Sequence, residues 1–249
     1  LALCARCSPA QPPSDAALDA ASTDALSDEA PSPDVVAPPD VTVPDPPGTD
    51  LPPVSIGDLT LRARTNGGFE LAVGAGPAAS QRVLLASNFG PVAAQRYTET
   101  VSTNSGFWTF RRTALTETRP SAGATARVDG EDLVLTVPDG AAMATMRFRR
   151  PNTNEVVVVA DVRGAAPYQS TALRFRCDAA SHFLGFGQQF NDADHRGRKF
   201  SLFVSEQGLG RDPARQTLFS GSHETTYFPV PFFLDPRGFG LAAVTNART

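Results

Sequence analysis

Residues 59–73 read LTLRARTNGGFELAV, and this stretch decides the fold class. Apolar and polar residues alternate over residues 59–64, and a second apolar segment follows at Phe69–Val73. Between them, Asn66–Gly68 supplies the positive backbone φ that a tight turn needs. A period of two on both sides of such a turn predicts an antiparallel β-hairpin rather than a helix.

The same pattern recurs along the chain. Short apolar or alternating segments stand at Leu133–Val137, Met143–Arg149, Phe232–Leu234 and Phe239–Leu241, and turn signals at Asp129–Gly130, Asn152–Asn154 and Pro236–Gly238. Val156–Val159 is apolar throughout, which predicts a strand buried on both faces. No long amphipathic helix is evident. The sequence therefore predicts an all-β fold, a two-sheet β-sandwich over residues 54–249.

Residues 8–53 have a different composition. They contain twelve prolines and nine acidic residues but no Lys or Arg. Such a segment cannot bury enough apolar surface to offset its chain entropy, which predicts a disordered, extended linker rich in Pro, Asp and Ala. Residues 54–249 then hold 21 basic and 17 acidic residues, a balance of about +4. This is too small a charge to indicate nucleic-acid binding.

The first seven residues, LALCARC, resemble the end of a bacterial lipoprotein signal, although a truncated start is an alternative. We expect residues 1–7 to be a remnant of that segment, with a lipid on Cys4, or else on Cys7. The protein would then be exported to the periplasm or cell surface, where the linker gives it reach from a membrane. Cys177 alternates with Leu173 and Phe175, which predicts a small buried apolar residue rather than part of a disulfide framework or zinc site.

Residues 185–211 read GFGQQFNDADHRGRKFSLFVSEQGLGR. The stretch combines glycines, amides, carboxylates and cationic side chains between apolar segments. A buried core does not need this mixture, whereas a loop that holds a polar ligand does.

This stretch and residues 226–240, TYFPVPFFLDPRGFG, resemble the N-terminal β-domain of glycoside hydrolase family 31. The piece SEQGLGR is similar to the sulfoquinovosidase branch of that family. The resemblance implies a mutarotase-like supersandwich placed before a C-terminal (β/α)₈ barrel that carries two catalytic aspartates. The parent would be a retaining α-glycosidase. The family's W-x-D-M-N-E segment has no counterpart here, since the one tryptophan, Trp108, has no nearby acid. We therefore expect no catalytic residue and no cofactor in this chain.

The resemblance also implies that part of the polar stretch lines the sugar pocket of the parent. The residues assigned to substrate binding are Gln189, Asn191, Asp194, Arg196 and Arg198, with Glu206 and Gln207 as a second wall. The planar fork of an arginine suits a sulfonate or carboxylate. Alternatively, Asp192, Asp194 and Arg196 only pair with one another and cap a turn. Gln188 departs from the glutamate common in the family, and His195 beside two aspartates is a weak metal signal, so no metal is predicted.

The expected function is therefore that of a non-catalytic domain at the front of an α-glycoside hydrolase. It would brace the barrel and supply a loop to the pocket for an α-linked sugar. The alternative is a surface-tethered carbohydrate-binding or structural β-sandwich lipoprotein without an enzymatic parent.

Overall fold

The computed structural model describes residues 46–104, 107–164, 167–177, 180–188, 193–197, 202 and 228–244, together with the backbone of Ala2–Arg6. Regular structure in these residues is almost entirely β. In chain order the elements are β1 (Ala2–Arg6), β2 (Val54–Ile56), β3 (Leu59–Ala63), β4 (Phe69–Val73), the 3₁₀ helix η1 (Ala78–Ser80), β5 (Arg82–Ser87), β6 (Val92–Asn104), β7 (Phe107–Thr118), β8 (Thr125–Asp129), β9 (Asp132–Asp139), β10 (Ala142–Asn152), β11 (Glu155–Arg163), β12 (Ser170–Arg176), β13 (Leu184–Gly187), β14 (Pro229–Asp235) and β15 (Phe239–Ala242).

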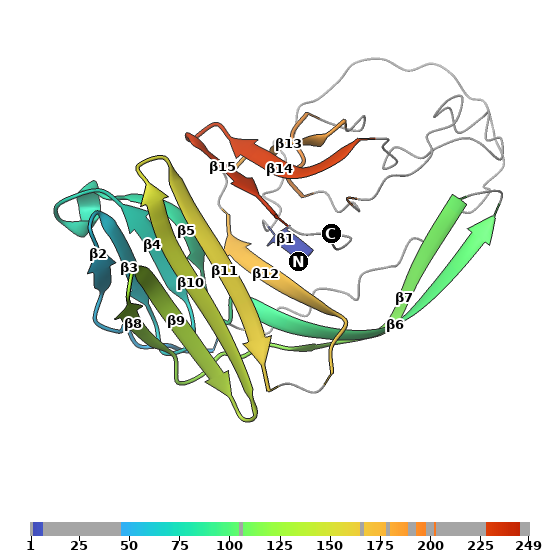
Figure 1. Cartoon of the computed structure of the whole chain (residues 1–249), viewed down its shortest axis with the longest axis horizontal. Helices are drawn as coiled ribbons and strands as arrows, with labels where there is room; N and C mark the ends of the chain where they lie inside the picture. Colours follow the sequence, from blue (N-terminus) through green and yellow to red (C-terminus); the bar gives the residue numbers. More distant parts are fainter. Residues whose placement is uncertain are drawn as a thin grey trace, which may run out of the picture.

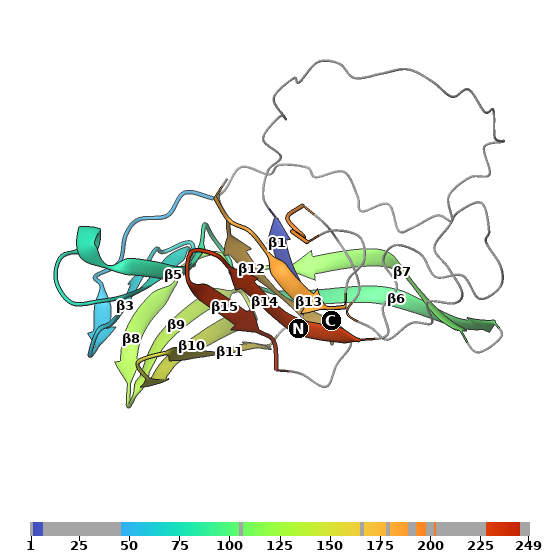
Figure 2. The same cartoon turned by 90° about the horizontal axis from the view of Figure 1, so that it is seen from above.

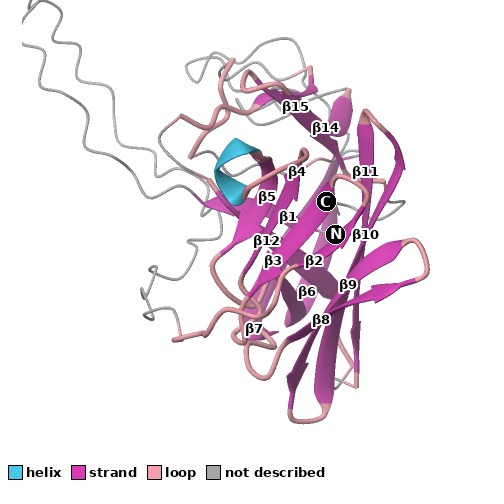
Figure 3. Cartoon of the chain, turned by 90° about the vertical axis from the view of Figure 1, so that its left-hand side faces the viewer, coloured by secondary structure: helices cyan, strands magenta, loops and turns pink. Residues whose placement is uncertain are grey.

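The strands form four sheets, with the orders β2-β3-β4-β5, β11-β10-β9-β8, β1-β12-β6-β7 and β13-β14-β15. The first two sheets lie face to face as a sandwich, which is seen from its side in Figure 3. The hairpin of β6 and β7 starts at the sandwich and extends far beyond it (Figure 1). The small sheet β13–β15 lies at one end, beside β5 and β12 (Figure 2). This arrangement confirms the predicted all-β sandwich.

The core lies between the two sandwich sheets. Leu61 and Leu71 on one side, and Leu133 and Phe148 on the other, are fully buried at 0% exposure. The rings of Phe69 and Phe148 meet across the interface with centroids 5.3 Å apart. Burial of each such side chain stabilises the fold by about 1.5–3 kcal/mol, so alternation on facing strands is sufficient to hold the layers together.

The predicted turn at Asn66–Gly68 is present and joins β3 to β4. Gly67 has φ +80°, and the Asn66 side chain accepts a hydrogen bond from the Gly68 backbone N–H over 2.9 Å. Gly68 must be glycine for a different reason, because a Cβ there would lie 2.2 Å from the carbonyl oxygen of Asn88. The turn thus combines a conformational requirement with a close backbone approach.

Residues 46–53, which composition assigns to the linker, lie against the sandwich. The Leu51 N–H donates to the Ala63 carbonyl over 2.8 Å, and Asp50 forms a bridge with Arg64. The Asn66 side chain donates to the Pro46 carbonyl over 2.8 Å. Within the described residues, contacts with the sandwich therefore begin at Pro46, eight residues before the predicted domain boundary at Val54. Residues 8–45, where the linker is predicted, lie outside the described residues.

The prediction that Val156–Val159 is buried on both faces is wrong. These residues lie in β11, which is the edge strand of its sheet and pairs with β10 alone among the described strands. Val157 and Val159 are 39% and 55% exposed, whereas Val156 and Val158 pack against the core. A continuous apolar run does not reveal which face is covered, since that depends on strands distant in sequence.

The prediction that Cys177 is only a small apolar residue is also wrong, because Cys177 is disulfide-bonded. The other cysteines of the chain are Cys4 and Cys7. Cys4 lies on β1, which pairs in parallel with β12 and places Arg6 opposite Arg176. The pairing brings together segments about 170 residues apart, and such a contact has no local signal in the sequence.

The part of the chain that the structure describes contains no helix long and apolar enough to cross a membrane.

Candidate ligand-facing site beside the small sheet

Of the polar loop predicted to face a ligand, the structure describes residues 193–197, which pack beside β13. Asp194 forms a bridge with Leu184, and the His195 N–H donates to the Phe183 carbonyl over 3.0 Å. His195 is buried at 4% exposure, and its ring meets the Phe186 ring edge-on at 5.6 Å. The loop is therefore held by backbone pairing and by a packed histidine.

Asp194 anchors this loop. Its Oδ1 accepts hydrogen bonds from the backbone N–H of Phe183 at 2.9 Å and of Arg196 at 3.1 Å. Its Oδ2 lies 2.6 Å from Nδ1 of His182. Burial by itself raises the pKa of Asp194, but the hydrogen bonds from Phe183 and His182 outweigh it and lower the pKa below its usual value. Asp194 is thus ionised at neutral pH and ties the loop to the segment before β13.

A second charged cluster stabilises the turn between β14 and β15. Asp235 is 2% exposed, and Arg237 donates to it through Nε at 2.9 Å, through a terminal nitrogen at 2.6 Å and through its backbone N–H at 2.9 Å. Arg237 also donates to the hydroxyl of buried Ser181 over 2.8 Å. Burial raises the pKa of Asp235, yet these bonds from Arg237 bring it below its usual value. The guanidinium is consequently fixed in one orientation.

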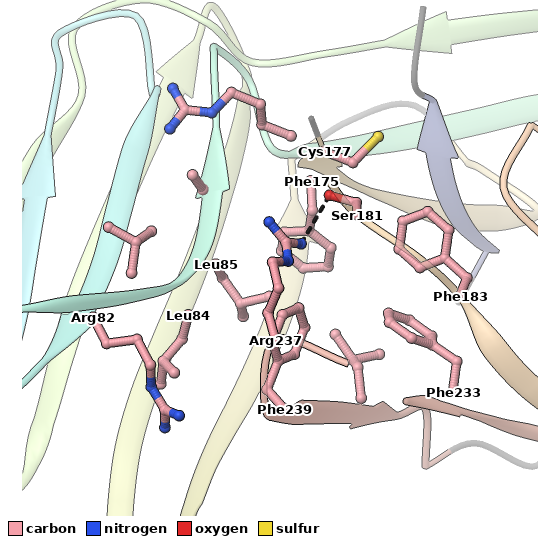
Figure 4. Close-up of a pocket in the computed structure, with 14 residues that line it drawn as sticks. Arg82, Leu84, Leu85, Phe175, Cys177, Ser181, Phe183, Phe233, Arg237 and Phe239 are labelled. Carbon is pink, nitrogen blue, oxygen red and sulfur yellow. Dashed lines mark hydrogen bonds between the residues drawn. The ribbon is translucent and has the colours of Figure 1, made fainter. Parts of the chain in front are cut away.

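This fixed guanidinium lines a cavity of about 270 Å³ between β5, the end of β12 and the small sheet. Figure 4 shows Arg237 among the lining side chains, with its hydrogen bond to Ser181. Among the described residues, the lining includes four phenylalanines and three arginines but no carboxylate: Phe175, Phe183, Phe233, Phe239, Arg82, Arg176 and Arg237.

Among the described residues, acidic side chains compensate only part of the positive charge of this cavity. Arg176 pairs with Glu70 at 3.0 Å, and Arg237 pairs with Asp235, while Arg82 donates to the Gly238 carbonyl over 3.4 Å. Guanidinium and aromatic groups together suit a small polar or anionic molecule. The volume lies just below the roughly 300–1,000 Å³ of most ligand pockets.

The structure places two of the seven predicted substrate-binding residues. Asp194 and Arg196 lie together in the anchored loop, and neither lines the cavity. The other predicted residues, Gln189, Asn191, Arg198, Glu206 and Gln207, lie outside the described residues. A ligand contact by any of the seven remains a prediction.

Sequence reasoning missed the cluster of Ser181, Asp235 and Arg237. The sequence pattern of Asp235–Gly238 predicts only a turn. An acid and an arginine two apart at a turn are a weak signal for an ion pair, and Ser181 joins them from 54 residues earlier. Among the described residues, no three His, Cys, Asp or Glu side chains are grouped so that they could hold a metal ion.

The sequence pattern of the family described as "Glycosyl hydrolase 31 N-terminal galactose mutarotase-like domain" matches residues 94–249 of this chain. The match covers most of the β6–β7 hairpin, the edge strand β11, the loop around Asp194 and the small sheet β13–β15.

Two sulfoquinovosidases and an isomaltosyltransferase are among the curated relatives. The chain is 34% identical over 83 residues to a sulfoquinovosidase of Agrobacterium fabrum, which covers 30% of this chain and 12% of that protein. It is 32% identical over 75 residues to a sulfoquinovosidase of Escherichia coli, covering 27% of this chain and 11% of that protein. An isomaltosyltransferase of Sporosarcina globispora is 23% identical over 146 residues, covering 58% of this chain and 12% of its own length.

A similar fold is found in a solved structure. A family 31 sulfoquinovosidase from E. rectale, in complex with an aza-sugar inhibitor, superposes with a TM-score of 0.54 and 17% identity, over 76% of this chain and 28% of that one. The chain thus matches only a small part of the length of these relatives. With a family pattern over more than half of its residues and the β-sandwich described above, the chain belongs to the N-terminal galactose mutarotase-like domain family of glycosyl hydrolase 31.

Proposed function

We propose that this chain is the non-catalytic front domain of a longer retaining α-glycoside hydrolase, in which it braces a C-terminal (β/α)₈ barrel. The observation that carries the proposal is the outer face of the small sheet. Phe228, Phe232 and Leu234 are 68%, 39% and 51% exposed, and Leu184, directly opposite Leu234, is 37% exposed. Their neighbours Phe233 and Asp235 point inward and are buried.

An apolar sheet face of this kind is typical of a surface that another domain covers. The aromatic residues before and within β14 divide between the two faces of the small sheet. Phe233 is 5% exposed and packs against Phe183 and Phe186 on the inner side of the small sheet, whereas Phe228 and Phe232 stay exposed for the junction. The relatives support a barrel as the occupant, since each is several times longer than the part it shares with this chain.

In the same proposal, the loop around Asp194 faces the sugar pocket of the parent. Asp194 holds the loop in place, and the side chain of Arg196, together with Asn191 and Arg198, meets the substrate. The names of two relatives favour a sulfonated α-glycoside, for which an arginine fork is a suitable partner.

We further propose that the protein is exported and carries a lipid. The disulfide at Cys177 supports export, because disulfides persist in oxidising compartments. Only one of Cys4 and Cys7 can pair with Cys177 within a chain, so the other is left for the lipid.

The test begins with the coding sequence beyond Thr249 and with hydrolysis of chromogenic α-sulfoquinovosides and α-glucosides by the product. A barrel with two catalytic aspartates and measurable turnover are the expected results. In that parent, replacing both Phe232 and Leu234 by Ser should lower the melting temperature of the barrel and its kcat. Val128→Ser, at a valine of 48% exposure on β8, is the matched control and should change neither. A stop codon after Thr249, or unchanged stability in the double variant, would reject the bracing role.

A further inference from the structure

In the part of the chain that the structure describes, β11 is an edge strand without the usual protection. It has nine residues, EVVVVADVR, with no proline and no lysine, and among the described strands it pairs only with β10. Native sheets normally shield such edges with lysines, prolines, bulges or a covering segment, because an open edge recruits another strand. The exposed Val157 and Val159 make this edge apolar as well as open.

The charges on the outer face of β11 are arranged so that the strand complements itself. If two copies pair antiparallel about Val159, Glu155 of each lies opposite the partner's Arg163, and Val157 lies opposite the partner's Asp161. Opposite charges across a strand pair contribute roughly 0.2–1 kcal/mol each. Arg163 is available for this contact, since its side chain is 79% exposed although it also pairs with Asp161.

The neighbouring registers are worse. Centring the pair on Val158 places Glu155 opposite the partner's Asp161, and centring it on Ala160 places Val157 opposite the partner's Arg163. A parallel pair in register would set Glu155 beside Glu155. The charge order thus selects one antiparallel register, which is also the arrangement that a two-fold axis requires.

We propose that β11 is the interface of a homodimer, in which two copies join their four-stranded sheets β11-β10-β9-β8 into one continuous sheet. The hydroxyl of Tyr168 donates to the Val162 carbonyl over 3.1 Å at one end of the edge, so backbone pairing centres on Val157–Asp161. An interface formed by one short strand from each copy is weak, so monomer and dimer exchange at about micromolar concentration. This inference is independent of the proposed barrel.

Sedimentation velocity of the 249-residue chain over a range of micromolar concentrations tests the proposal. The expected result is a reversible monomer–dimer equilibrium. Val159→Lys sets two like charges on the two-fold axis and should weaken dimerisation at least about tenfold. Val128→Lys is the control, since Val128 is 48% exposed on β8, the opposite edge strand of the same sheet, and it should leave the equilibrium unchanged.

A charge exchange tests the register. Glu155→Arg and Arg163→Glu should each weaken the dimer, and the double variant should restore it, while circular dichroism confirms that all variants are folded. A chain that stays monomeric at every concentration overturns the proposal, as does equal weakening by the control. A double variant as weak as the single ones overturns the register.

Discussion

At the scale of single residues, the pairing of Asp235 with Arg237 makes a prediction about pH. Asp235 is buried, and in the described residues its ion-pair partner is Arg237. Arg237→Ala leaves a buried carboxylate without its cation, which should lower the free energy of unfolding by about 3 kcal/mol at neutral pH. Urea unfolding followed by circular dichroism measures this change. Arg111→Ala, at an exposed arginine of β7, should change stability by less than about 0.5 kcal/mol.

The sign of the pH dependence follows from the lowered pKa of Asp235. A carboxyl whose pKa is lower in the folded state stabilises the protein fully above its unfolded pKa of about 3.9. That stabilisation is lost as the pH falls through the folded pKa. The stability difference between the wild type and Arg237→Ala should therefore close in acid, and a difference that persists there would assign the effect to packing instead.

At the scale of elements, two turn glycines, Gly68 between β3 and β4 and Gly57 between β2 and β3, separate two reasons for glycine. Gly68→Ala places a Cβ against the Asn88 carbonyl, a backbone atom that cannot move aside, and should cost about 2–3 kcal/mol. Gly57 has φ +59° with nothing within 4 Å of the added Cβ, so Gly57→Ala should cost only the conformational strain of about 1 kcal/mol. Chemical unfolding of the two variants checks the order, and a larger loss at Gly57 would contradict it.

At the scale of the whole molecule, the disulfide of Cys177 joins distant parts of the chain, because the other cysteines are Cys4 and Cys7. Its loss in Cys177→Ser should lower the free energy of unfolding by about 2–4 kcal/mol, because the cross-link restricts the unfolded chain. A reductant should lower the free energy of unfolding of the wild type to that of the variant and leave the value of the variant unchanged. Non-reducing peptide mapping should recover one peptide joined to Cys177 and leave the other N-terminal cysteine for the lipid. A reductant that lowers both proteins equally would show that the disulfide is not the cause.

Individual strands and tight turns could be predicted from the sequence alone. The hairpin at residues 59–73 and the Asp129–Gly130 turn each need only neighbours in the chain, since alternation sets the face and glycine permits the turn. The family resemblance was carried by residues 185–240, and the family pattern bears it out.

Only the tertiary structure decided which contacts form between distant segments. The exposure of Val159 depends on the absence of another described strand beside β11, and the disulfide of Cys177 depends on strand pairing across most of the chain. The oxygens of Asp194, for which a substrate contact stays a prediction, are directed to His182, Phe183 and Arg196 by the approach of the loop to β13. The sequence by itself determined the fold class and the family, because both rest on local periodicity and short motifs. Partners of charged and sulfur-containing side chains arise from folding in three dimensions, and no local pattern encodes them.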